Sequence, residues 1–184
     1  YAAWCWVAEN AAELGIEPSR LAIAGSSAGG GLAAGVTLLA RDRRGPLPAR
    51  QMLLCPMLDD REITASSTEL EGEGRWDRVA NRTGWSAYLG DRRGGDDVPV
   101  YAAPARAIDL AGLPPTFIDV GDVETFRDED IVYAIRLSGA GVPVELHVWP
   151  GGVHGFTGIA PEAALSRAAL AARRDYLRRS MIDR

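Results

Sequence analysis

The stretch that decides the fold spans residues 21–32 and reads Leu-Ala-Ile-Ala-Gly-Ser-Ser-Ala-Gly-Gly-Gly-Leu. Four apolar residues lead into Gly25-Ser26-Ser27-Ala28-Gly29, and an Ala/Leu/Val-rich segment of about four helical turns leads out of it. This is the strand-turn-helix context of a Gly-x-Ser-x-Gly nucleophile elbow, which projects the serine hydroxyl above the sheet edge. Ser27 is therefore the candidate nucleophile. We expect Gly25 and Gly29 to remove Cβ atoms that would collide in the turn.

The backbone N–H of Ala28 follows the candidate nucleophile and opens the predicted helix. Helix N-termini present unpaired N–H donors and the positive end of the helix dipole, and both favour a developing negative oxygen. Ala28 is therefore the candidate oxyanion-hole donor. Glycines 29–31 come after the serine, where small residues allow a helix and a strand to pack closely.

Only two histidines are present, so the search for a general base is short. His147 alternates with apolar residues in the stretch 144–149, which is typical of a strand residue facing solvent or a neighbour. His154 follows the Pro-Gly-Gly breakers at 150–152 and is expected in a loop after that strand. Parallel sheets gather strand ends on one edge, and the triad order on this kind of sheet is serine, acid, histidine. His154 is therefore the candidate base.

The candidate acids follow the predicted strand 116–120, and they are Asp122, Glu124, Asp128, Glu129 and Asp130. The last three fit the first turn of a helix that ends near Ser138-Gly139, where carboxylates complement the helix dipole. Asp122 and Glu124 remain in the loop. Either one could accept the imidazole Nδ1 proton, fix the tautomer and stabilise the imidazolium.

Several segments carry a family resemblance that covers nearly the whole chain: Gly-Ser-Ser-Ala-Gly-Gly-Gly-Leu-Ala-Ala (25–34), Tyr-Ala-Ala-Pro-Ala-Arg (101–106), Leu-Ala-Gly-Leu-Pro-Pro-Thr-Phe (110–117), Phe-Arg-Asp-Glu-Asp (126–130) and His-Gly-Phe (154–156). The chain resembles the hormone-sensitive-lipase-like esterases of the α/β-hydrolase fold. In that family the acid opens an Asp-Pro-Leu-Arg-Asp-Glu-type run. Matching residues 126–129 onto the end of this run implies that the acid is Glu124, with Asp122 second.

The chain departs from the family pattern in three ways. Ser26 precedes the nucleophile where the family usually has Asp, and the implied acid is a glutamate. Family members also carry a His-Gly-Gly-Gly-type loop whose amides complete the oxyanion hole, and nothing before Leu21 resembles it. The chain begins at Tyr1, inside a segment of helical spacing that runs to Leu14. We interpret residues 1–184 as a single catalytic domain, incomplete at its N-terminus, from a longer hydrolase.

Composition excludes several classes of protein. The apolar content of 47% allows a sizeable core, and no apolar run approaches the roughly 18 residues of a membrane span. The net charge is −5, and the arginines are scattered rather than gathered in a basic patch, so nucleic acid is not an expected partner. The expected partner is a small-molecule ester, and the oligomeric state stays open, a homo-oligomer included.

Cys5 and Cys55 lie among apolar residues without Cys-x-x-Cys or Cys/His spacing. This pattern favours buried free thiols in a reducing, cytoplasmic compartment over a disulfide or a metal site. No metal and no cofactor are expected, because triad chemistry uses only protein groups.

Four strands are predicted at 21–24, 51–55, 116–120 and 144–149, separated by helical patterns or long connections, which indicates an α/β fold with a mostly parallel sheet and helices on both faces. A last helix from Pro161 to about Arg179 is expected to turn a stripe toward the sheet, made up of Leu165, Ala169, Ala172 and Tyr176.

Residues 57–104 form an irregular insertion, expected near the active-site mouth. Within it, Trp85 and Tyr88 have two interpretations: they shape a substrate pocket, or they pack the insertion onto the body. The run Asp59-Asp60-Arg61 is read as a turn held by local hydrogen bonds rather than as a metal or ion-pair site.

These features predict a carboxylic ester hydrolase that works through an acyl-enzyme on Ser27. A first alternative is a catalytically idle hydrolase-fold module, or a truncated product without the oxyanion loop. A nearer one is a peptidase or acyltransferase, because fold and triad do not select the leaving group.

Overall fold

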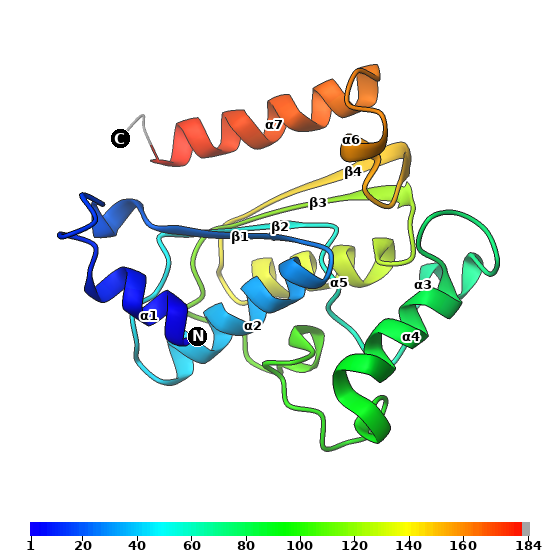
Figure 1. Cartoon of the computed structure of the whole chain (residues 1–184), viewed down its shortest axis with the longest axis horizontal. Coiled ribbons are helices and arrows are strands. Elements are labelled where there is room, and N and C mark those ends of the chain that lie inside the picture. Colours follow the sequence, from blue (N-terminus) through cyan, green and yellow to red (C-terminus); the bar gives the residue numbers. More distant parts are fainter. Residues whose placement is uncertain (182–184) are drawn as a thin grey trace.

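The computed structural model describes residues 1–181, so residues 182–184 of the expected domain lie outside it. One four-stranded sheet forms its centre (Figure 1). All neighbouring strands pair in parallel, and their order in the sheet follows the chain: β1 (Ala22–Ser26), β2 (Arg50–Leu54), β3 (Thr116–Val123) and β4 (Val144–Val153). The carboxyl ends of the strands therefore share one edge of the sheet, as the sequence predicts.

Helices cover both faces of the sheet (Figure 1). The helices α1 (Ala2–Glu9), α2 (Ala28–Asp42) and α5 (Arg127–Gly139) lie on one face, and α7 (Ala164–Met181) lies on the other. The predicted α/β fold class is thus confirmed. The N-terminal helix ends at Glu9, short of the predicted Leu14, because residues 10–15 form turns.

Alternating strand residues supply the two sides of the core, because successive side chains point to opposite faces of a sheet. Leu53 and Ile118 belong to the large cluster that includes Leu38 of α2 and Leu137 of α5. Their neighbours in sequence, Met52 and Phe117, instead pack against Tyr176 of α7. The predicted apolar stripe of the last helix is confirmed at Ala169 and Tyr176, which are 0% and 6% exposed.

Three strands run past their predicted ends. β3 continues from residue 120 to Val123, so Asp122 lies on the strand rather than in the expected loop, and Glu124 follows the strand directly. β1 continues through Gly25 and Ser26, which pair with Leu53 and Leu54. β4 continues through residues 150–152, which we expected to break it. Among residues 1–181, β4 pairs with β3 alone, so Pro150 removes no hydrogen bond that a second neighbouring strand would need.

The insertion at 57–104 is more regular than expected, because it contains α3 (Ser66–Glu69) and α4 (Arg78–Leu89) beside the carboxyl ends of the strands (Figure 1). Asp77 caps α4 by accepting a hydrogen bond from the Ala80 N–H at 2.8 Å. Trp85 and Leu89, four residues apart on α4, pack with Phe126 in a second apolar cluster.

The turn at residues 59–61 is only partly local. Asp59 pairs with Arg61, as expected, at 2.7 Å. Asp60 instead forms a long-range ion pair with Arg106, at 2.6 Å, and accepts from the Gly94 N–H. The preference for a purely local turn is therefore wrong for Asp60. Within residues 1–181, no helix combines the length and the hydropathy needed to cross a membrane.

Candidate active site

Ser27 lies between the end of β1 and the start of α2 with φ 57° and ψ −124°. A positive φ is unusual for a residue with a side chain and costs energy that the surroundings must offset. Two hydrogen bonds hold the turn: the Ser27 N–H donates to the Leu54 carbonyl at 2.8 Å, and the Ser27 carbonyl accepts from the Met57 N–H at 3.0 Å. The strand-turn-helix geometry expected for a nucleophile elbow is therefore present.

The glycines around this turn differ in whether a Cβ atom would fit, and the pattern differs from the one expected. A Cβ on Gly25 would lie 2.0 Å from the Gly29 carbonyl oxygen, so Gly25 is required. A Cβ on Gly29 would meet nothing within 4 Å, so the expectation that Gly29 relieves a collision is wrong. The crowded positions are instead the next two glycines. A Cβ on Gly30 would lie 2.8 Å from the Pro56 side chain, and a Cβ on Gly31 would lie 2.2 Å from the Met57 carbonyl oxygen.

His154 lies directly after β4, and its Nε2 is 3.0 Å from the Ser27 Oγ. Three strand spacings, roughly 14 Å, separate β1 from β4 in the sheet, so the loop after β4 must bring the ring back over the sheet edge. Gly155 permits this bend with a φ of 71°. His147, by contrast, stays on β4, where it is 3.0 Å from Glu145 and stacks on Trp149.

Glu124 and Asp122 have different partners in the structure. Both Glu124 carboxylate oxygens lie 2.9 Å from the His154 Nδ1, and the side chain is buried. Asp122 instead accepts a hydrogen bond from the Gly151 N–H at 2.6 Å, in the segment that leads to His154. The structure therefore brings Ser27, His154 and Glu124 together and leaves Asp122 as a support for the backbone.

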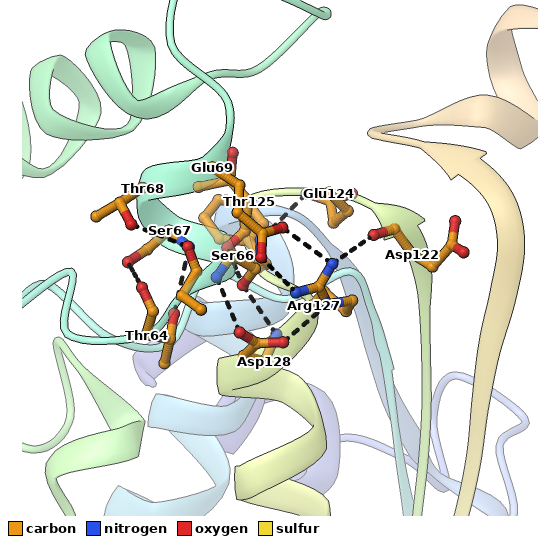
Figure 2. A network of polar contacts seen from close by, with 12 residues as sticks. Thr64, Ser66, Ser67, Thr68, Glu69, Asp122, Glu124, Thr125, Arg127 and Asp128 are labelled. Atoms are coloured by element: carbon orange, nitrogen blue, oxygen red, sulfur yellow. Dashed lines mark hydrogen bonds and ion pairs between the residues drawn. The ribbon is translucent and has the colours of Figure 1, made fainter.

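The segment that carries Glu124 is anchored by a polar network to α3 (Figure 2). Arg127 donates to the Asp122 carbonyl at 3.0 Å and pairs with Glu69 at 3.1 Å. The Thr125 carbonyl accepts from the Ser66 hydroxyl at 3.0 Å. These contacts fix the backbone on both sides of Glu124, so the insertion helps to position the acid.

The three carboxylates at 128–130 occupy the first turn of α5, as predicted, but two of them are buried. Glu129 accepts from the backbone N–H groups of Leu58 and Asp59 at 2.7 and 3.2 Å. Asp130 has no hydrogen-bond partner for either oxygen among the described residues. Burial raises the pKa of both carboxyl groups well above their ordinary values.

The His154 ring is enclosed by aromatic side chains and by Glu124. The Phe126 ring meets it edge-on at 5.5 Å, and the Trp76 ring lies 5.9 Å away. Burial alone lowers the pKa of the imidazole, but hydrogen bonding with Cys55 and Glu124 and the negative charge of Glu124 raise it above its ordinary value. The surroundings therefore favour the imidazolium that forms when a serine proton is taken.

Cys55 is buried and free, as predicted, but its surroundings are not purely apolar. Its Sγ lies 3.8 Å from the Ser26 Oγ and within 4.8 Å of both a Glu124 oxygen and a His154 nitrogen. These polar surroundings of Cys55 were not predicted from the sequence. The available signal was its place at the carboxyl end of β2, between the strands that deliver Ser27 and Glu124. Cys5, the second free cysteine, is only partly buried, on α1.

An apolar pocket of about 230 Å³ lies beside the elbow. Both earlier interpretations of the insertion aromatics apply, because Trp85 and Tyr88 line this pocket while Trp85, only 1% exposed, also packs the insertion onto the body. The remaining lining residues come from α2, from the segment after β2 and from the insertion: Ala28, Gly31, Leu32, Met57, Trp76, Gly84 and Ala102.

Comparison with known proteins places this geometry in a family. Residues 1–158 match the family described as having the alpha/beta hydrolase fold. The chain belongs to the α/β-hydrolase family. The resemblance to hormone-sensitive-lipase-like esterases is thereby confirmed at the level of the family.

Two relatives illustrate the similarity in sequence within this α/β-hydrolase family. Carboxylesterase NlhH of Mycobacterium tuberculosis is 39% identical over 167 residues, which cover 87% of this chain and 50% of the relative. An arylesterase of Saccharolobus solfataricus is 31% identical over 153 residues, covering 83% of this chain and 49% of the relative. The chain thus spans about half the length of these relatives.

A solved structure is similar over almost the entire chain. A bacterial heroin esterase superimposes with a TM-score of 0.95 at 46% identity, covering 98% of this α/β-hydrolase chain and 58% of that protein.

Proposed function

We propose that the protein is a carboxylic ester hydrolase in which Ser27 is the nucleophile, His154 the general base and Glu124 the orienting acid. The observation that carries the proposal is the relay from the Ser27 Oγ to the His154 Nε2, 3.0 Å long, continued from Nδ1 to Glu124 at 2.9 Å. Nucleophile, base and acid within hydrogen-bond reach are the arrangement that activates a serine. The esterase names of the relatives support the same reaction class.

The reaction proceeds in two acyl-transfer steps. The Ser27 Oγ attacks the ester carbonyl carbon while its proton passes to His154 Nε2, and the Ala28 N–H donates to the resulting oxyanion. The C–O bond then breaks, the alcohol leaves with the proton from Nε2, and the acyl group stays on Ser27. Water, deprotonated by His154, attacks the acyl-enzyme and releases the carboxylic acid. Every proton transfer uses a protein group, so the proposal requires no cofactor.

The apolar pocket supports an ester with an apolar substituent. The pocket touches Ala28, the proposed oxyanion donor, so a group bound there lies next to the reacting carbonyl. We also propose that residues 1–184 belong to a single catalytic domain, with residues 57–104 beside the mouth of its active site, and that the protein works in the cytoplasm.

The decisive experiment compares Ser27→Ala with Ser138→Ala, an exposed serine at the end of α5. The proposal expects Ser27→Ala to abolish p-nitrophenyl ester hydrolysis and labelling by a fluorophosphonate, whereas Ser138→Ala keeps both. Retention of hydrolysis within a few-fold by folded Ser27→Ala would overturn the assignment. Absence of labelling in the folded parent would favour the idle module. Faster cleavage of an anilide than of the matching ester would favour a peptidase.

A further inference from the structure

A thiol, a carboxylate and an imidazole meet at the end of the sheet and form what we term the soft-ligand cluster: Cys55, Glu124 and His154. Cys55 Sγ, one Glu124 carboxylate oxygen and one His154 ring nitrogen all lie within 4.8 Å of one another. Cys55 and Glu124 are 8% and 2% exposed, and the His154 side chain is 14% exposed. The esterase mechanism uses Glu124 and His154 but gives Cys55 no task.

The donor set of the soft-ligand cluster suits a thiophilic divalent cation. Zinc is bound in proteins by thiolate sulfur, imidazole nitrogen and carboxylate oxygen at about 2.0–2.3 Å, whereas Mg²⁺ and Ca²⁺ require oxygen ligands. Such bond lengths set ligand atoms roughly 3.3–3.8 Å apart, so the side chains need to move by only about 1 Å. One thiolate and one carboxylate also neutralise a doubly charged cation, which lowers the cost of burying it.

A small cavity beside the cluster also favours a cation. A cavity of about 20 Å³, lined in part by Ser26, Cys55 and Glu124, adjoins the cluster and has room for about one water molecule as a fourth ligand. Arg173, which also lines the cavity, is already neutralised by Asp119 at 2.7 Å.

We infer that the soft-ligand cluster is an inhibitory binding site for a thiophilic divalent cation, of which Zn²⁺ and Cd²⁺ are the probes. Binding breaks the Cys55 S–H bond and releases that proton to solvent, moves the ring proton of neutral His154 from Nδ1 to Nε2, and forms metal–sulfur, metal–nitrogen and metal–oxygen bonds. Glu124 then no longer accepts from the ring, and Nε2, which faces the Ser27 Oγ, carries the ring proton and cannot accept the proton of Ser27. The inhibitory effect rests on the proposed function, but cation binding does not.

The binding test uses metal-free protein titrated with Cd²⁺ while thiolate-to-cadmium charge-transfer absorption is recorded. The chain offers a matched pair of variants, Cys55→Ser and Cys5→Ser, one for each free cysteine. The parent and Cys5→Ser are expected to develop the band at one Cd²⁺ per chain, and Cys55→Ser to lose it, with affinity reduced by at least about 10-fold. A band that vanishes in Cys5→Ser and persists in Cys55→Ser would overturn the inference.

The inhibition test is separate and uses Zn²⁺ against p-nitrophenyl ester hydrolysis, with Mg²⁺ as the control ion. Zn²⁺ is expected to inhibit the parent and Cys5→Ser reversibly, with recovery after chelation, and to inhibit Cys55→Ser at least about 10-fold more weakly relative to its own metal-free rate. Equal inhibition of all three proteins would reject the site. A cadmium band in a protein without esterase activity would refute the proposed function and leave the cation site standing.

A melting-temperature measurement tests whether the loss of binding in a Cys55 variant comes from the lost ligand and not from misfolding. A cation that binds only the folded protein raises the melting temperature of that protein. Cys55→Ala, with circular dichroism matching the parent, is expected to show no Zn²⁺-dependent rise, whereas Cys5→Ser shows the full rise. An equal rise in Cys55→Ala would contradict the inference.

Discussion

His154 directs its Nδ1 at both carboxylate oxygens of Glu124, each 2.9 Å away, and this contact joins the loops that follow two neighbouring strands. An ionised carboxylate can accept hydrogen bonds but cannot donate them. The contact therefore assigns the proton of the neutral ring to Nδ1 and leaves a lone pair on Nε2. That lone pair faces the Ser27 Oγ at 3.0 Å. The carboxylate thus determines which ring nitrogen is available as a base.

The first prediction concerns this carboxylate. Glu124→Gln should lower kcat/KM for a p-nitrophenyl ester by about 10³-fold or more, because an amide neither fixes the tautomer nor stabilises the imidazolium. Asp122→Asn should cost much less, since the Asp122 side chain accepts from the Gly151 N–H and not from His154. Steady-state kinetics on the two isosteric variants check the order, and the reverse order would move the acid to Asp122.

The second prediction concerns two glycines of the elbow. Gly25→Ala should lower the free energy of unfolding by at least about 2 kcal/mol, because its Cβ would lie 2.0 Å from the Gly29 carbonyl oxygen. Gly29→Ala should leave it unchanged or raise it by up to about 1 kcal/mol, since open space surrounds the new methyl group and alanine favours helix. Urea unfolding followed by circular dichroism distinguishes them, and equal losses would contradict the crowding argument.

The third prediction is a pH dependence. Hydrolysis requires neutral His154, and the hydrogen bonds and charge around the ring outweigh its burial and raise its pKa above 6.5. In chelator-treated protein, kcat/KM should therefore rise with pH, with the midpoint of this limb above 6.5. Glu124→Gln should move the midpoint to lower pH, because it removes the anion that stabilises the charged ring. A midpoint that stays in place in this variant would disagree with the electrostatic account.

The fourth prediction concerns the pocket wall. Tyr88→Ala should raise the ratio of kcat/KM for p-nitrophenyl hexanoate over acetate by a few-fold, because the pocket loses a wall residue that is itself 52% exposed. Val79→Ala is the matched control, since Val79 is an exposed apolar residue on the same helix outside the pocket lining. A similar change in both variants would argue against a specific effect of the pocket.

The elements that could be predicted are those with strong local signals. The sheet and its flanking helices follow from apolar strand segments and from the pattern Gly25 to Gly29. Strand ends were less predictable, because β4 reaches Val153 through a pairing with Val123 of β3 that lies beyond a register shift. The choice of Glu124 over Asp122 needed the family resemblance, since the sequence alone does not show that β3 extends through Asp122 and ends just before Glu124.

Other parts of the site depend on contacts that no local pattern encodes. Cys55 looked like a core residue, because the residues around it in sequence are apolar while its polar neighbours come from other strands. The burial of Asp130 was equally hidden, since an acidic first helical turn usually faces solvent. Trp76, in the segment before α4, is far from His154 in sequence, and only the folded chain brings the two rings to 5.9 Å.

Each of the four strands contributes one residue at its carboxyl end or just beyond it: Ser27, Cys55, Glu124 and His154. Ser27 follows the first of these strands, and His154, its general base, follows the last. The nucleophile can therefore be activated only after all four strands have paired in the correct register. The rate at which Ser27 becomes reactive toward a covalent label during refolding therefore measures how fast β4 pairs with β3. It reports this single event, whereas circular dichroism reports average secondary structure.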